Sequence, residues 1–306
     1  MWNHKLNQVV DVNMEPDKNA KTYDPDKEVK YFLHKKEHPS VDKSMLIDLR
    51  NIQPDSEHIN TTGWWFIGIH GMWGALIDSP ITNPLVKEIH KNQSANVIHV
   101  DWEDGAGSYW YPTNVANGEL VGKSVAKVIQ ILVDKSIAKK ELIHLVGFSL
   151  GGQVVGIVGH SIYKTGGWKP KRITSLDPAR LSYEGYPEEG TIDPTDGEYV
   201  EVVHSSGGQL GVWTPHGHVD IYLNDGYGPQ PGCGWDVLRN CSHFFAKRIY
   251  GDYNHLEMES YRCSSFGDFS NGNCNHDTNT ACVLGIVAKT CKGGVYQLDT
   301  TRYVND

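Results

Sequence analysis

The chain has 306 residues, of which 39% are hydrophobic and 21% are charged, and its formal net charge is −9. This size suits one large α/β domain or two smaller ones, and the apolar content excludes an intrinsically disordered chain. The negative charge argues against nucleic acid as a partner, and no stretch approaches the roughly 20 apolar residues that span a bilayer. We therefore expect a globular protein that is not transmembrane.

The chain begins with a polar segment, residues 1–28, which we predict to be a loose lead-in to a single domain over residues 29–306. Short β-rich runs follow at residues 30–34, 64–70, 95–101, 142–148, 172–177 and 199–204. Several of these runs are continuously apolar, which is typical of parallel strands covered by helices on both faces. The pattern predicts an α/β fold built on a mostly parallel sheet.

One amphipathic helix is predicted between the third and fourth of these runs. Its apolar residues recur at helical spacing, and they are Val121, Val125, Val128, Ile129, Leu132 and Val133. We expect this stripe to face the core. From about Gly207 onward the sequence is rich in glycine, proline, aromatic residues and cysteine, which indicates an elaboration at one end of the same sheet.

The strongest chemical signal is Gly147-Phe148-Ser149-Leu150-Gly151, a match to the GxSxG nucleophile elbow. In this motif a serine sits on a strained strand-to-helix turn, and the glycines leave room for the turn. The apolar run before the motif and the helical pattern after it fit that context. A helix beginning after Ser149 would also direct its N-terminal dipole toward a developing oxyanion. A glycine-rich turn without chemistry is the alternative.

A serine nucleophile needs a base and an acid, which follow the serine in the order Asp, His in α/β-hydrolases. Asp177 ends the β-rich run after the elbow, so it should project from the carboxyl end of the adjacent strand. On residue type alone the acid has three rivals, Asp193, Asp196 and Asp220. The histidines in question are His204, His216, His218, His243, His255 and His276. We favour His243, with His218 second, because it closely follows Cys241 in a loop that a disulfide can fix.

All six cysteines lie between Cys233 and Cys291, in a loop-rich region and without the tight spacing of a zinc knuckle. We therefore predict disulfides, which form in secreted proteins. Three N-glycosylation sequons, at Asn60, Asn92 and Asn240, fit the same compartment. The sequence thus predicts a secreted, extracellular glycoprotein.

These landmarks together resemble the pancreatic lipase family of animal lipases, and within it the smaller phospholipase A1-like enzymes of insects. The resemblance covers about residues 28–295. It rests on Ile69-His70-Gly71-Met72, Val100-Asp101-Trp102, Gly147 to Gly151, Ser175-Leu176-Asp177-Pro178-Ala179, Asp193-Pro194-Thr195-Asp196, Val203-His204, Gly217-His218-Val219-Asp220 and Cys241-Ser242-His243. The chain departs from the family at Phe148, Gly152 and Gln153, where His, Ala and His are usual, and at Met72, where an aromatic residue is usual.

The resemblance implies an α/β-hydrolase fold with Ser149 as nucleophile, Asp177 as acid and His243 as base. It also implies an oxyanion hole formed by the backbone N–H groups of Met72 and Leu150. The resemblance implies that the reaction requires no cofactor. A structural calcium is implied at Asp193 and Asp196, with backbone carbonyls from about Glu188 and Thr191, although a hydrogen-bonded turn without metal fits the same residues.

The resemblance further implies the disulfides Cys233–Cys241, Cys263–Cys274 and Cys282–Cys291. The first closes a short lid, residues 233–241, in which Trp235, Val237 and Leu238 are positioned to touch lipid. A short lid favours phospholipase A1-type cleavage of glycerolipids. Triacylglycerol lipase or galactolipase activity is the alternative. The second alternative is a non-catalytic lipid-binding protein like the related yolk proteins. We expect no C-terminal lipid-binding sandwich. The expected partner is a lipid substrate at a membrane, micelle or droplet surface. The sequence does not predict the oligomeric state.

Overall fold

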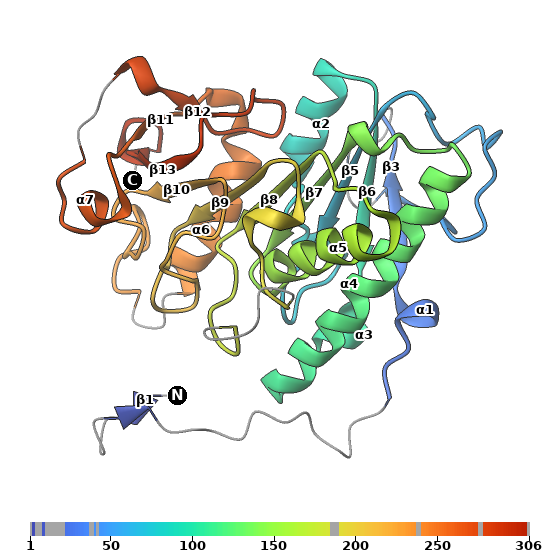
Figure 1. The fold of residues 1–306 in the computed structure, drawn as a ribbon, viewed down its shortest axis with the longest axis horizontal. Helices are drawn as coiled ribbons and strands as arrows, with labels where there is room; N and C mark the ends of the chain where they lie inside the picture. Colours follow the sequence, from blue (N-terminus) through green and yellow to red (C-terminus); the bar gives the residue numbers. More distant parts are fainter. Residues whose placement is uncertain are drawn as a thin grey trace.

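The computed structural model describes residues 2–3, 8–9, 22–36, 40, 43–183, 190–236, 240–274 and 278–304. Within these ranges β1 (Trp2–Asn3) and β2 (Gln8–Val9) pair antiparallel, and the other strands form one 11-stranded sheet (Figure 1). Its strands are β3 (Lys30–His34), β4 (Met45–Leu46), β5 (Trp64–Ile69), β6 (Ala95–Asp101), β7 (Ile143–Phe148), β8 (Arg172–Leu176), β9 (Val200–His204), β10 (Val219–Leu223), β11 (Glu259–Arg262), β12 (Cys282–Val283) and β13 (Gly294–Leu298).

The strand order is β12-β11-β13-β10-β9-β8-β7-β5-β6-β3-β4. All neighbours from β13 through β6 run parallel, whereas β11–β13, β11–β12, β3–β6 and β3–β4 pair antiparallel at the two ends of the sheet. The residues after Gly207 contribute β10 to β13 to this same sheet, and those strands were not among the predicted runs. The six predicted runs match β3 and β5 to β9, with boundaries that differ by no more than one residue, whereas the two-residue strand β4 was not predicted.

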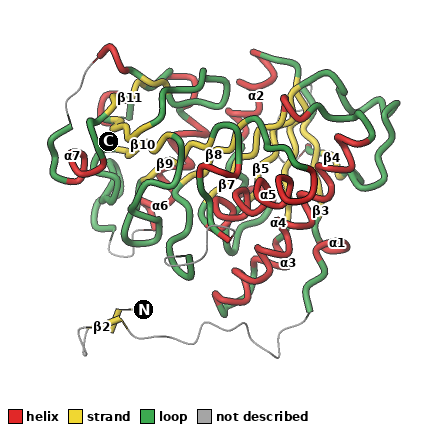
Figure 2. Tube along the Cα trace, viewed as in Figure 1, coloured by secondary structure: helices red, strands yellow, loops and turns green. Residues whose placement is uncertain are grey.

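Helices cover both faces of the sheet, as the red and yellow tubes of Figure 2 show. The helices are α1 (Pro25–Glu28), α2 (Asn83–Asn92), α3 (Glu103–Ala106), α4 (Tyr111–Asp134), α5 (Leu150–Gly166), α6 (Asn240–Asp252) and α7 (Phe266–Ser270). One core joins α4 and α5 to residues such as Ile67 and Ile98, and a second joins α2 and α6 to residues such as Phe66 and Val97. Successive side chains along β5 and β6 therefore point to opposite faces of the sheet and join different cores. The predicted α/β-hydrolase fold is confirmed.

Helix α4 begins ten residues before the predicted stripe. The residues Val121, Val125, Val128, Ile129 and Leu132 are all buried, as expected, but the helix also includes Gly118 and Gly122. A Cβ atom on Gly122 would come within 2.7 Å of Ile157 in α5. These glycines let α4 and α5 pack closely, and they made the first half of α4 look unlike a helix, because glycine has low helix propensity.

The predicted loose lead-in is wrong for its last residues. Asp24 caps α1 by accepting a hydrogen bond from the Asp26 N–H, and Asp26 accepts one from Ser124 of α4 at 2.6 Å. Tyr23 is buried. Polar residues that form a cap and an interhelical contact resemble a solvated tail in the sequence alone, which explains the error. In the described ranges, no helix combines the length and the apolar character needed to cross a membrane.

Candidate active site

Ser149 occupies a strained turn between β7 and α5. Its backbone has φ 57° and ψ −122°, a conformation that costs a non-glycine residue about 1–3 kcal/mol. A Cβ atom on Gly147 would lie 2.1 Å from the carbonyl oxygen of Gly151, and one on Gly151 would lie 2.3 Å from that of Ile69. Only glycine fits at either position. The turn therefore has the geometry of a nucleophile elbow.

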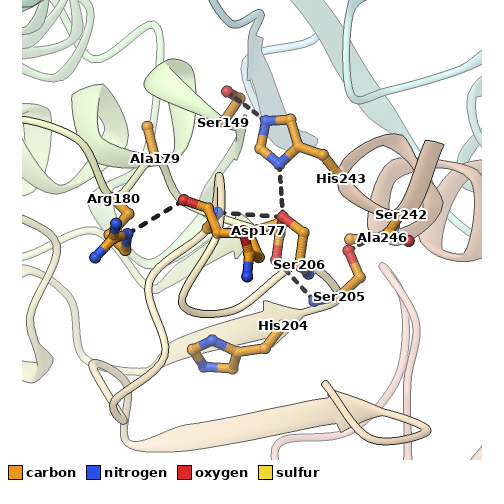
Figure 3. A network of polar contacts seen from close by, with 12 residues as sticks. Ser149, Asp177, Ala179, Arg180, His204, Ser205, Ser206, Ser242, His243 and Ala246 are labelled. Atoms are coloured by element: carbon orange, nitrogen blue, oxygen red, sulfur yellow. Dashed lines mark hydrogen bonds and ion pairs between the residues drawn. The ribbon is translucent and has the colours of Figure 1, made fainter. Parts of the chain in front are cut away.

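The side chains of Ser149, His243 and Asp177 form a continuous chain of hydrogen bonds (Figure 3). His243 Nε2 lies 2.7 Å from Ser149 Oγ, and His243 Nδ1 lies 2.6 Å from Asp177 Oδ2. Asp177 and His243 are buried. With the Nδ1 proton donated to the carboxylate, Nε2 is left to accept the serine proton, which is the relation that a general base requires.

The Asp177 carboxylate lies in a site built to keep it ionised. Oδ1 accepts the N–H groups of Ser205 and Ser206 at 2.7 and 3.0 Å, and Oδ2 also accepts the Ser206 hydroxyl. Burial by itself raises the pKa of Asp177. The hydrogen bonds from His243, Ser206 and Ser205, with the attraction of the imidazole, outweigh burial and hold the pKa below its ordinary value.

The other candidates for acid and base lie elsewhere. His204 pairs with Asp220 at 2.9 Å in a buried contact, and His218 accepts a hydrogen bond from the Val200 N–H through Nδ1. His216 contacts the Ile192 carbonyl, His255 is exposed, and His276 is outside the described residues. Of the residues weighed from the sequence, the described structure therefore brings only Asp177 and His243 to the serine.

The loop that carries Met72 passes directly over the serine. A Cβ atom on Gly71 would lie 2.9 Å from Ser149 Cβ. The loop is fixed by Trp102, whose indole N–H donates to the His70 carbonyl at 2.9 Å and whose backbone N–H donates to His70 Nε2 at 3.1 Å. Leu150 is the first residue of α5. Both expected oxyanion donors thus belong to segments adjoining Ser149.

The departures from the family pattern have structural partners in this chain. The Phe148 ring packs on the His243 ring with centroids 4.8 Å apart. Gln153 is fully buried; its Nε2 donates to the Ala179 carbonyl at 2.7 Å and its Oε1 accepts the Ile192 N–H at 2.9 Å. Gln153 therefore ties α5 to the loop after Asp177. Sequence reasoning assigned no role to Phe148, Gln153, Trp102 or Ser206.

Three disulfides, Cys233–Cys241, Cys263–Cys274 and Cys282–Cys291, have the pairings that the family resemblance implied. The first closes the short loop before His243. Within it, the Asp236 carboxylate accepts the N–H groups of Cys241 and Ser242 at 3.2 and 2.7 Å, and so caps the helix that carries His243. Trp235 is 98% exposed, whereas Val237 and Leu238 lie outside the described residues.

Asp193 and Asp196 lie together away from the serine. Asp193 Oδ1 accepts the Thr195 N–H and Asp196 Oδ2 accepts the Asp193 N–H, both within the turn. Among the described residues, the buried atoms Asp193 Oδ2 and Asp196 Oδ1 have no hydrogen-bond partner. Burial and the neighbouring Asp193 raise the pKa of Asp196 to about 9. His160 Nδ1 lies 4.0 Å from Asp196 Oδ1, beyond hydrogen-bond distance. Two close carboxylates with oxygens that lack hydrogen bonds fit a hard cation; Thr191 is close by in the chain, and Glu188 lies outside the described residues.

A sequence model of the lipase family matches residues 4–305 of this chain. The protein belongs to the lipase family. Lipase member H of Rattus norvegicus is 32% identical over 232 residues, which cover 72% of this chain and 48% of that protein. Lipoprotein lipase of Neovison vison is 32% identical, covering 81% of this chain and 56% of the relative. Pancreatic triacylglycerol lipase of Mus musculus is 28% identical over 90% of this chain and 63% of its own length.

The chain spans about half the length of the curated relatives it matches. Among solved structures, the esterase PE8 aligns over 48% of this chain and 69% of its own at 14% identity, with a TM-score of 0.35. The family membership and the expected resemblance to pancreatic lipases are confirmed by the sequence relatives.

Proposed function

We propose that this protein hydrolyses carboxylic esters of lipids, with Ser149 as nucleophile, His243 as general base and Asp177 as acid. The observation that carries the proposal is the hydrogen-bonded chain from Ser149 Oγ through His243 to Asp177, with the serine on its strained elbow. Membership of the lipase family supports lipid esters as the substrate class.

The reaction follows from this geometry in two steps. Ser149 Oγ attacks the ester carbonyl while His243 Nε2 takes the serine proton, and Asp177 stabilises the imidazolium that forms. The backbone N–H groups of Leu150 and Met72 hold the oxyanion. The imidazolium then protonates the departing alcohol or lysolipid. Water, deprotonated by His243, then attacks the acyl-serine; the imidazolium returns that proton to Ser149 Oγ as the acyl–oxygen bond breaks and the fatty acid leaves.

The substitution Ser149→Ala tests the proposal. We expect ester hydrolysis to fall by at least ~10³-fold, with an unchanged thermal midpoint, because the nucleophile is removed without filling space. The control is Ser161→Ala, at a partly buried position in the second half of α5. If Ser149→Ala kept wild-type hydrolysis, Ser149 would not be the nucleophile. If the wild type itself hydrolysed no ester, a non-catalytic lipid-binding role like that of the yolk proteins would replace the enzymatic proposal.

For the substrate we propose phospholipase A1-type cleavage of glycerolipids, with triacylglycerol lipase or galactolipase activity as the alternative. The support is the short loop closed by Cys233 and Cys241, which lie 8 positions apart and leave little chain to cover the serine. Parallel assays on phosphatidylcholine, galactolipid and triglyceride test this. Release of fatty acid from the sn-1 position of phosphatidylcholine is the expected preference; faster turnover of triglyceride would contradict it.

We propose that the partner is a lipid surface and that the protein is secreted. Large apolar side chains stand exposed on loops near the serine: Trp73, next to Met72, is 60% exposed, and Tyr109, after β6, is 96% exposed. The sequons Asn60 and Asn92 precede β5 and β6, so they lie at the amino ends of the parallel strands. The serine follows β7 and lies at the carboxyl ends. Disulfides support an oxidising compartment. Detection of glycosylated protein in the culture medium tests secretion, and retention inside the cell would contradict it.

We also propose that Asp193 and Asp196 hold a structural calcium. The support is the pair of buried carboxylate oxygens without hydrogen-bond partners among the described residues. Such an ion would neutralise two close negative charges and would take no part in the reaction. Calcium titration of chelator-treated protein should raise its thermal midpoint, and Asp193→Asn should abolish that increase. An unchanged midpoint would favour the metal-free turn.

A further inference from the structure

Ser206 contributes a hydroxyl group to the triad that the mechanism above does not use. It lies in the turn after β9 and is fully buried (Figure 3). Its O–H donates to Asp177 Oδ2, the oxygen that also accepts from His243 Nδ1, and its Oγ lies 3.3 Å from that nitrogen. A single hydroxyl thus touches both the acid and the base.

The direction of this hydroxyl is set by a second contact. Ser206 Oγ accepts the Gly211 N–H at 3.1 Å, which occupies an oxygen lone pair and leaves the O–H proton for the carboxylate. Gly211 can approach because it has no side chain: a Cβ there would lie 2.6 Å from Asp177 Oδ1. The Ser206 N–H also donates to Oδ1. The backbone around Ser206 therefore holds a hydroxyl donor on the acid.

The neighbouring Ser205 provides the natural contrast. It is equally buried and also donates its backbone N–H to Asp177. Its hydroxyl oxygen, however, accepts the Ala246 N–H of α6 at 3.3 Å. The two adjacent serines share their burial and their backbone role, and they differ in whether the side chain contacts the triad.

We propose that Ser206 is a positioning residue that tunes how strongly Asp177 holds the His243 imidazolium; this inference rests on the proposed triad. The Ser206 O–H partly neutralises the charge on Oδ2. Without it, more of that charge acts on His243, which favours the protonated imidazole. The 3.3 Å contact of Oγ with Nδ1 acts in the opposite direction, but the Gly211 N–H directs the hydroxyl proton to Oδ2, so the donation to the carboxylate dominates. Loss of the hydroxyl therefore strengthens the hold of Asp177 on the imidazolium.

The test is the pH profile of kcat/KM for Ser206→Ala and Ser205→Ala, with soluble p-nitrophenyl butyrate as the probe. We expect Ser206→Ala to lower kcat/KM at pH 7 roughly tenfold, the loss of one hydrogen bond to a charged group, and to shift the acid limb to higher pH. Ser205→Ala should leave the acid limb in place, because alanine keeps the backbone N–H and the lost hydroxyl does not contact the triad. A merely structural role would let Asp177 move away from His243, which shifts the acid limb to lower pH.

An acid limb that stays in place or moves to lower pH in Ser206→Ala, or an equal shift in Ser205→Ala, overturns the proposal. If Ser206→Ala does not fold, Ser206→Cys replaces it, because a thiol is a weaker donor and should give a smaller shift in the same direction. Failure of the triad itself is a separate result, since it would appear as retained hydrolysis in Ser149→Ala. The two inferences can therefore fail independently.

Discussion

Two regions of the molecule meet at the serine, and they hold their catalytic groups by different means. The elbow and Asp177 belong to β7 and β8, in the middle of the parallel sheet, and glycines and buried backbone contacts fix them. His243 arrives from α6, beyond that part of the sheet, and is held by a disulfide, a helix cap and the Phe148 ring. Close backbone packing fixes the first region. The second region packs α6 into the core, but the start of α6, which carries His243, also has separate attachments, each of which can be removed.

The largest effect is expected where the packed region is broken. Gly151→Ala places a Cβ 2.3 Å from the Ile69 carbonyl oxygen, so it should remove most activity and destabilise the fold by about 1–3 kcal/mol through overpacking. Chemical denaturation and ester hydrolysis measure both effects. The matched control is Gly267→Ala in α7, where the nearest atom lies 3.5 Å away. Wild-type activity in Gly151→Ala would show that the elbow does not need this close approach.

Asp177→Asn removes the charge of the acid but keeps its shape. We expect kcat to fall by about 10³ to 10⁴-fold, because the imidazole loses the group that selects its tautomer. The pKa of Asp177 is depressed in the fold, so its contribution to stability is present above the unfolded pKa of about 3.9 and is lost as the pH falls through the lower folded pKa. Urea unfolding from pH 6 to pH 2 should therefore show a weaker pH dependence in the variant.

The disulfides separate stability from activity in the second region. The double variant Cys233→Ser/Cys241→Ser and the double variant Cys263→Ser/Cys274→Ser each open a short loop and should each cost about 2–3 kcal/mol. We expect only the first to lower kcat, by roughly tenfold, because only that loop leads into α6. Assays below both unfolding transitions make the comparison. Equal kcat values in the two variants would contradict a role for the loop in holding His243.

The smallest effect is expected at the helix cap. Asp236→Ala removes the acceptor for the Cys241 and Ser242 N–H groups and should cost about 1 kcal/mol, with a few-fold lower kcat. Ser265→Ala removes the cap of α7 and should cost a similar amount without changing kcat. Thermal unfolding and hydrolysis of a soluble ester measure the pair. A kcat loss in Ser265→Ala would show that general loosening, rather than the cap of α6, is responsible.

The same contrast explains what the sequence allowed us to predict. Strands β3 and β5 to β9, the elbow and Asp177 depend on continuous apolar runs and glycine spacing, which are visible locally. The contacts of Ser206, Gln153 and Trp102 depend on residues that are remote in the chain, as with the bond between Gln153 and Ile192. His243 was predicted only because a cysteine lies close to it and because of the family resemblance. Strands β10 to β13 lie among glycines and turns that hide their short apolar patterns.

The central claim is that His243 makes the Ser149 hydroxyl nucleophilic. The most direct measurement is the rate and site of labelling by a fluorophosphonate, followed by intact mass and peptide mapping in the wild type, Ser149→Ala and His243→Ala. We predict a single adduct on Ser149 in the wild type, none in Ser149→Ala, and labelling slowed by at least ~10²-fold in His243→Ala. Labelling of His243→Ala at the wild-type rate, or an adduct on another residue, would contradict the account.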